Sequence, residues 1–76
     1  MKIEYSKDAD ALYITLNDND VEESDEITED IIMDYDKDGN VVGIEILWAS
    51  EKADISQILI RSFDKEKVTV ESAKVA

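Results

Sequence analysis

The sequence contains neither cysteine nor histidine, and Gly39 and Gly43 are its only glycines. Without cysteine there are no disulfides and no thiolate metal sites, and without histidine the usual general base and zinc ligand are missing. Two isolated glycines do not make a glycine-rich phosphate loop. Because the serines also have no histidine to activate them, we expect the protein not to be an enzyme.

Long apolar runs are missing as well. No stretch approaches the roughly 20 residues that a membrane-spanning helix needs, and the amino terminus lacks the apolar core of a secretion signal. We therefore expect a cytoplasmic protein. The 76 residues predict a single small domain, residues 1–76. A chain this short buries only about 60% of its unfolded surface, so its core is small.

Acidic residues outnumber basic residues by 20 to 8, which gives a formal net charge of −12. The charge is uneven, because residues 1–36 hold 13 acids and two bases while residues 37–76 hold seven acids and six bases. Such a field repels nucleic acid and anionic membranes and attracts cations or basic protein surfaces. A requirement for solubility alone would also account for the excess of acidic residues.

Residues 2–5 and 11–16 alternate apolar and polar side chains, as strands with one buried face do. The polar residues 6–10 between them are typical of a turn, so the pattern predicts a β-hairpin. Asp8 and Asp10 in that turn are interpreted as turn formers rather than as a cation site. The expected buried side chains are Ile3, Tyr5, Leu12, Ile14 and Leu16.

Residues 17–30 contain eight acids and no base, with Val21 and Ile27 as the only apolar residues. We interpret this segment as a solvated crossing loop that could contain a short edge strand near Ile27. Its length is unusual for a connection and indicates either mobility or a role in contact. A basic partner could dock here, although an acidic loop that binds nothing gives the same pattern.

Residues 31–48 form two apolar runs around an acidic centre at residues 36–40. Alternation in both flanks and turn-forming residues at the centre predict a second β-hairpin. The same stretch fills the D-x-D-x-D-G-x5-E pattern of a calcium loop, in which oxygen ligands at alternate positions precede a bidentate glutamate. The residues that fill the pattern are Asp34, Asp36, Asp38, Gly39 and Glu45.

The register of this hairpin follows from the requirement that the apolar side chains of both strands face the same core. Met33 should pair with Ile44 and Tyr35 with Val42, which leaves the four-residue loop 37–40. The expected core side chains are Ile31, Met33, Tyr35, Val42, Ile44, Ile46 and Trp48.

The hairpin and the complete calcium loop exclude each other. In the hairpin, Glu45 lies on the order of 13 Å along the strand from Asp36, whereas calcium ligands lie about 2.3 to 2.6 Å from the ion. Strand-like flanks favour the hairpin, since a calcium loop of this kind needs helices on both sides. The hairpin is still compatible with a weak calcium or magnesium site formed by Asp34, Asp36 and Asp38. Glu45 would join this site only if the loop is EF-hand-like.

Residues 49–63 are predicted to form a helix across the open face of the sheet. An apolar stripe at helical spacing and a capping box that starts at Asp54 favour it. The alternative is a strand at 58–60 in a hairpin with 68–70, so helix and strand both stay open for residues 54–63. The segment 68–70 resembles a short last strand.

The block ADALYI at residues 9–14 follows Tyr5, and the block DYDKDGNVVGIEIL follows at residues 34–47. In this order, these blocks resemble the bacterial and archaeal family called domain of unknown function 2283, over roughly residues 1–50. The resemblance implies a small α+β domain with an antiparallel sheet in which the acidic loop is a hairpin turn. It implies no activity and no functional residue. Through family members that lie beside small toxins, the resemblance also implies an antitoxin role.

The sequence thus predicts an α+β fold with a four-stranded antiparallel sheet built as two hairpins, one carboxyl-terminal helix and, as an option, a short last strand. The predicted function is a non-enzymatic binding role in which the acidic amino-terminal half engages a basic protein partner. The alternative is weak calcium or other divalent-cation binding by the loop 34–45. Homodimer formation through the sheet edge or Trp48 is a third hypothesis. No nucleic-acid or membrane partner is expected.

Overall fold

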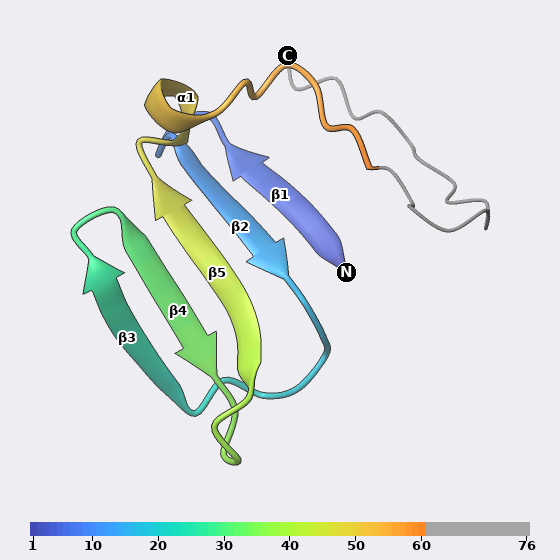
Figure 1. The fold of residues 1–76 in the computed structure, drawn as a ribbon, viewed down its shortest axis with the longest axis vertical. Coiled ribbons are helices and arrows are strands. Elements are labelled where there is room, and N and C mark those ends of the chain that lie inside the picture. The colour runs from blue at the N-terminus through green and yellow to red at the C-terminus, as the bar shows by residue number, and fades with distance from the viewer. Residues whose placement is uncertain (61–76) are drawn as a thin grey trace.

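A computed structural model describes residues 1–60, which form one antiparallel sheet and one short helix (Figure 1). The order of strands across the sheet is β1-β2-β5-β4-β3. The predicted antiparallel sheet with a helix is confirmed, but the sheet has five strands rather than four. The elements are β1 (Lys2–Ser6), β2 (Ala11–Thr15), β3 (Glu23–Thr28), β4 (Ile31–Tyr35), β5 (Val41–Leu47) and α1 (Ala49–Lys52).

Strands β1 and β2 form the first predicted hairpin. Ile3 pairs with Ile14 and Tyr5 with Leu12, so the apolar side chains of both strands share one face. The turn between the strands ends at Asp10, whose backbone φ of 48° is left-handed. Aspartate is among the few residues other than glycine that adopt this conformation often.

Strands β4 and β5 form the second predicted hairpin, and most of its register is confirmed. Met33 pairs with Ile44 as predicted. Tyr35, however, pairs with Val41 rather than with Val42, because the register shifts by one residue near the turn. Val42 is the extra residue of this bulge, and only 3% of its surface is exposed.

The hairpin loop is one residue shorter than predicted. The Asp36 amide donates to the Asn40 carbonyl at 2.9 Å, which leaves the three-residue loop 37–39 in place of 37–40. The Gly39 amide donates to the Asp36 carbonyl at 3.1 Å, and Gly39 has a φ of 82°. A turn followed by a left-handed glycine is the usual three-residue hairpin loop.

Strand β3 is the element that the sequence interpretation predicts only in part. The crossing-loop prediction is wrong for residues 23–28, which pair with β4 and place Ser24 opposite Asp34. The short edge strand near Ile27 is closer, although the observed strand begins earlier. All six residues of β3 are exposed. Backbone hydrogen bonds to β4 hold the strand, so its formation needs no apolar face.

The predicted carboxyl-terminal helix is largely absent from the described residues. Helix α1 has four residues, and the backbone is already extended at Ala53, with φ −141°. Asp54 does not open a helix, because its carboxylate accepts the Ser56 amide at 3.0 Å in a local turn. Within residues 1–60 no helix is long and apolar enough to cross a membrane.

The strand alternative is not observed at 58–60 either. The rest of the helix prediction, at 61–63, and the predicted last strand at 68–70 lie outside the described residues.

The sheet has one apolar and one polar face. Apart from Val42 and Ala49, the apolar residues described by the structure are half-buried or exposed. Side chains from residues 53–58 lie beside β1 and β2, and together they line a groove of about 260 Å³. By the strand pairing, the apolar face carries Ile3, Tyr5, Leu12, Ile14, Ile31, Met33, Ile44 and Ile46.

Two residues predicted for the core are exposed instead. Leu16, just after β2, is 41% exposed, and Trp48, just after β5, is 51% exposed. Trp48 has a left-handed backbone, with φ 49° and ψ 45°, which ends the alternation of β5. The following residue, Ala49, is buried and donates its amide to the Asp10 carbonyl at 2.9 Å. Docking of α1 on the first hairpin thus turns Trp48 outward.

Candidate functional site

The most distinctive surface is a run of acids on one edge of the sheet. We call residues 18–30 the acidic strip; it comprises the end of the β2–β3 connection, β3 and the turn into β4 (Figure 1). Every residue from 18 to 29 is exposed. The strip contains eight carboxylates and no base. Because these side chains face water on an outer strand, a partner can reach them without rearrangement of the fold.

The first part of the strip borders a hollow of about 460 Å³ next to the β4–β5 turn. Lys37 is the only base among the residues that line the hollow. The net charge of the hollow is therefore negative, and the hollow suits a basic side chain. The lining residues are Asp18, Asn19, Asp20, Glu22, Asp36, Lys37 and Asp38.

Asp36 is the one buried charged side chain among residues 1–60, at 8% exposure. Its Oδ1 accepts the amides of Asp38 and Asn40, both at 2.9 Å, and its Oδ2 accepts Asn19 Nδ2 at 2.9 Å. The Asn40 amide, with Asn19 and Asp38, lowers the pKa of the Asp36 carboxyl below its ordinary value. The carboxylate therefore closes the turn and ties it to the β2–β3 connection.

Asp34 lies on the polar face and accepts two hydroxyl groups. Tyr13 Oη donates to its Oδ2 at 2.5 Å and Ser24 Oγ donates to its Oδ1 at 2.6 Å. The Tyr13 side chain crosses β5 above Gly43 to reach Asp34. Its hydrogen bond to Asp34, together with partial burial, raises the pKa of Tyr13 to about 12. The network connects β2, β4 and β3 across the polar face.

The predicted cation ligands are distributed over different parts of the hairpin. Asp34 is on the polar face, Asp36 is buried in the turn, and Asp38 is exposed in the loop. Glu45 lies in β5 opposite Ile32, as the hairpin register predicts. Within residues 1–60 no three carboxylates are grouped so that they could hold a metal ion. Asp34 and Asp36 are engaged by protein donors, and cation binding stays a prediction.

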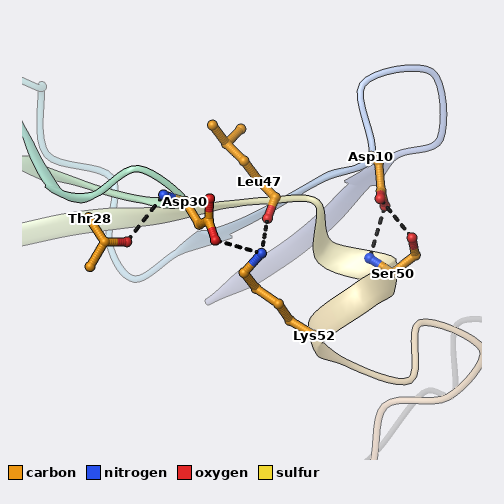
Figure 2. Close-up of polar contacts among 6 residues, drawn as sticks. All are labelled: Asp10, Thr28, Asp30, Leu47, Ser50 and Lys52. Atoms are coloured by element: carbon orange, nitrogen blue, oxygen red, sulfur yellow. Dashed lines mark hydrogen bonds and ion pairs between the residues drawn. The ribbon is translucent and has the colours of Figure 1, made fainter.

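The opposite end of the sheet is held together by a second polar cluster (Figure 2). Asp10 accepts the Ser50 amide at 2.9 Å and Ser50 Oγ at 2.7 Å, which fastens α1 to the first turn. Lys52 Nζ forms an ion pair with Asp30 at 2.9 Å and donates to the Leu47 carbonyl at 3.0 Å. The Tyr5 hydroxyl donates to Asp10 at 2.6 Å, and this hydrogen bond lowers the pKa of Asp10.

Sequence reasoning predicts Asp10 as a turn former but misses its contacts to α1. It also misses the hydrogen bonds that Asn19 donates to Asp36 and that Tyr13 donates to Asp34. One signal was present for Tyr13, because a strand glycine often marks the place where a bulky side chain approaches the backbone closely. No local pattern indicates Asn19, since its partner lies 17 residues away in the chain.

Comparison with known proteins adds one finding. The model of a family described as "Protein of unknown function (DUF2283)" matches residues 2–50. The matched residues span β1 to the start of α1 and include Asp10, Tyr13, Asp34 and Asp36. No curated protein and no solved structure matches the chain.

Proposed function

The chain belongs to the DUF2283 family of proteins of unknown function, and we propose that it acts as a non-enzymatic binding module whose acidic strip engages a basic protein. The family description names no activity, so the proposal rests on the physical chemistry of the surface. The family resemblance implies a small toxin as partner, and a basic toxin would have the charge that the strip requires.

The observation that carries the proposal is that residues 1–60 provide almost no neutralising partner for the carboxylates of the strip. Among the described residues only Asp30 of the strip forms an ion pair, with Lys52 at 2.9 Å. The second ion pair within residues 1–60, Lys2 with Glu4 at 3.5 Å, lies on β1. Like charges that lie close together without a counter-charge repel one another and raise the local potential. A basic surface relieves that repulsion when it binds.

Electrostatics of this kind acts chiefly on the rate and selectivity of association. Complementary fields steer a basic partner toward the strip and disfavour acidic partners. Solvent-exposed charges are screened by salt, with a Debye length of about 10 Å at 0.1 M and about 3 Å at 1 M. Binding should therefore be strong at low salt and weak at high salt.

The test is a pull-down from source-cell lysate with the tagged full chain, at low salt and at about 1 M salt. We expect basic proteins to be retained at low salt and released at high salt. A variant neutralised within the strip should lose them. Its substitutions are Glu22→Gln, Glu23→Gln, Asp25→Asn and Glu26→Gln.

The matched control loses the same number of charges elsewhere on the surface and should keep its partners. Its substitutions are Glu4→Gln, Asp8→Asn, Glu45→Gln and Glu51→Gln. Recovery of no basic protein at low salt would contradict the proposal, as would equal losses in the two variants.

A further inference from the structure

Within residues 1–60, strand β3 has one neighbour in the sheet. It is the last of the described strands in the order β1-β2-β5-β4-β3, so the backbone groups on its outer side pair with no strand of residues 1–60. All six of its residues, Glu23–Thr28, are exposed. An edge of this kind is a template onto which another extended segment can add by backbone hydrogen bonds.

The hydrogen bonds to β4 show which amides point outward. The Leu47 amide donates to the Asp30 carbonyl at 2.8 Å, so in the β4–β5 ladder the backbone groups of residues 30, 32 and 34 point toward β5 and those of residues 31, 33 and 35 point toward β3. Glu23 and Asp25, which pair with Tyr35 and Met33, therefore turn their amides toward β4. The amides of Ser24 and Glu26 then point away from the sheet and are the donors available to an added strand.

The charges of β3 oppose pairing with a second copy. Two β3 strands side by side would bring Glu23, Asp25 and Glu26 against the same carboxylates, and like charges on neighbouring strands destabilise the pair. The other edge, β1, has no such charge and carries the ion pair of Lys2 with Glu4. The same carboxylates that exclude an identical strand favour a basic one.

Side-chain directions specify the partner further. Asp25 lies opposite Met33 on the apolar face of the sheet, and Glu26 lies opposite Ile32 on the polar face. Basic side chains on both faces of an added strand would therefore meet carboxylates. Val21 and Ile27, each 48% exposed, flank the central acids and offer apolar contacts near the ends of the segment.

We propose that the basic partner adds to the outer edge of β3 as an extended segment and forms a sixth strand of the sheet. This inference rests on the proposed function and adds to it the conformation of the partner. A β3 of six residues accommodates about 20 Å of added strand. Backbone hydrogen bonds hold the segment, and its lysine or arginine side chains provide the selectivity.

The test compares two substitutions at one position. Glu26→Gln and Glu26→Pro both remove the carboxylate, but only proline also removes the outward amide. Proline is tolerated on edge strands because no inward hydrogen bond is lost. The probe is a synthetic peptide that alternates lysine with valine and threonine, and its affinity is measured by calorimetry at low salt.

We expect Glu26→Gln to weaken peptide binding by about threefold, and Glu26→Pro to weaken it by a further factor of about five or more. In the wild type, peptide should slow hydrogen exchange at the amides of Ser24 and Glu26 more than at Glu23 and Asp25. This second readout needs no variant, so it holds even if the proline disturbs the strand.

Equal affinities of the Glu26→Gln and Glu26→Pro variants, with no added protection of the outward amides, would overturn strand addition and leave the proposed acidic docking surface intact. No binding of the peptide to the wild type would overturn both. A dimer of the wild-type chain alone in sedimentation that Glu26→Pro dissociates would show that a second copy occupies the edge, which also overturns the inference.

Discussion

The Tyr13 side chain packs against the backbone of Gly43, and this contact is possible only because glycine has no side chain. Gly43 is buried in β5, and a methyl group added there would overlap the Tyr13 hydroxyl and lie 2.7 Å from Tyr13 Cζ. The backbone of Gly43 is not left-handed, so the requirement for glycine is steric. The missing side chain lets Tyr13 reach Asp34 on the far side of β5.

We predict that Gly43→Ala destabilises the protein by about 1 to 3 kcal/mol, the usual cost of overpacking. Urea unfolding measures the free energy of unfolding. In a Tyr13→Thr background, which removes the ring and keeps a good strand former, the same substitution should be neutral or stabilising, because alanine is favoured over glycine in a strand by about 0.5 to 1 kcal/mol. Equal costs in the two backgrounds would show that the ring does not set the requirement.

The turn between β4 and β5 depends on the ionised Asp36 carboxylate, which joins it to the β2–β3 connection through Asn19. The pKa of Asp36 is lowered in the folded state, chiefly by the Asn40 amide, so the folded state favours the ionised form. Its contribution to stability is therefore complete well above the ordinary value of 3.8 and is lost as the pH falls through the lower pKa of the folded state.

We predict that Asp36→Asn lowers the free energy of unfolding at neutral pH and that the difference from the wild type narrows below about pH 4. Chemical unfolding over a pH series measures this difference. Asp38→Asn is the control, because it removes the same charge from an exposed position in the same loop and should change stability little at any pH. A difference for Asp36→Asn that stays constant down to pH 2 would exclude a role for the ionised carboxylate.

At the scale of the whole molecule, a net charge of −12 on 76 residues opposes compaction. Among residues 1–60 only two ion pairs offset it. Screening by salt should therefore stabilise the fold while it weakens the binding of a basic partner. The same surface charge would therefore make stability rise and binding affinity fall as salt is added.

We predict that sodium chloride between about 0.05 and 0.5 M raises the urea midpoint of the wild type. Chloride is preferred to sulfate here because sulfate strengthens apolar burial in any protein. The variant neutralised in the acidic strip should respond less than the control neutralised elsewhere. A midpoint that is unchanged or falls with salt would mean that the carboxylates do not destabilise the folded state.

The sequence by itself determined the two hairpins and the register of the second one up to the bulge at Val42. Period-two alternation specifies which side chains share a face, and a slip of one residue would expose the whole apolar set. Alternation also favoured strands over the helices that a complete calcium loop needs, and the observed position of Glu45 opposite Ile32 agrees.

Only the tertiary structure decided the elements that local pattern does not control. Strand β3 has no apolar face, and its formation depends on the free edge that β4 offers after folding. Trp48 continues the apolar alternation in the sequence, yet the Ala49 amide and the Asp10 carbonyl, 39 residues apart and 2.9 Å distant, turn it outward. Contacts between residues distant in the chain are set by how the hairpins lie against each other, and that arrangement leaves no periodic trace in the sequence.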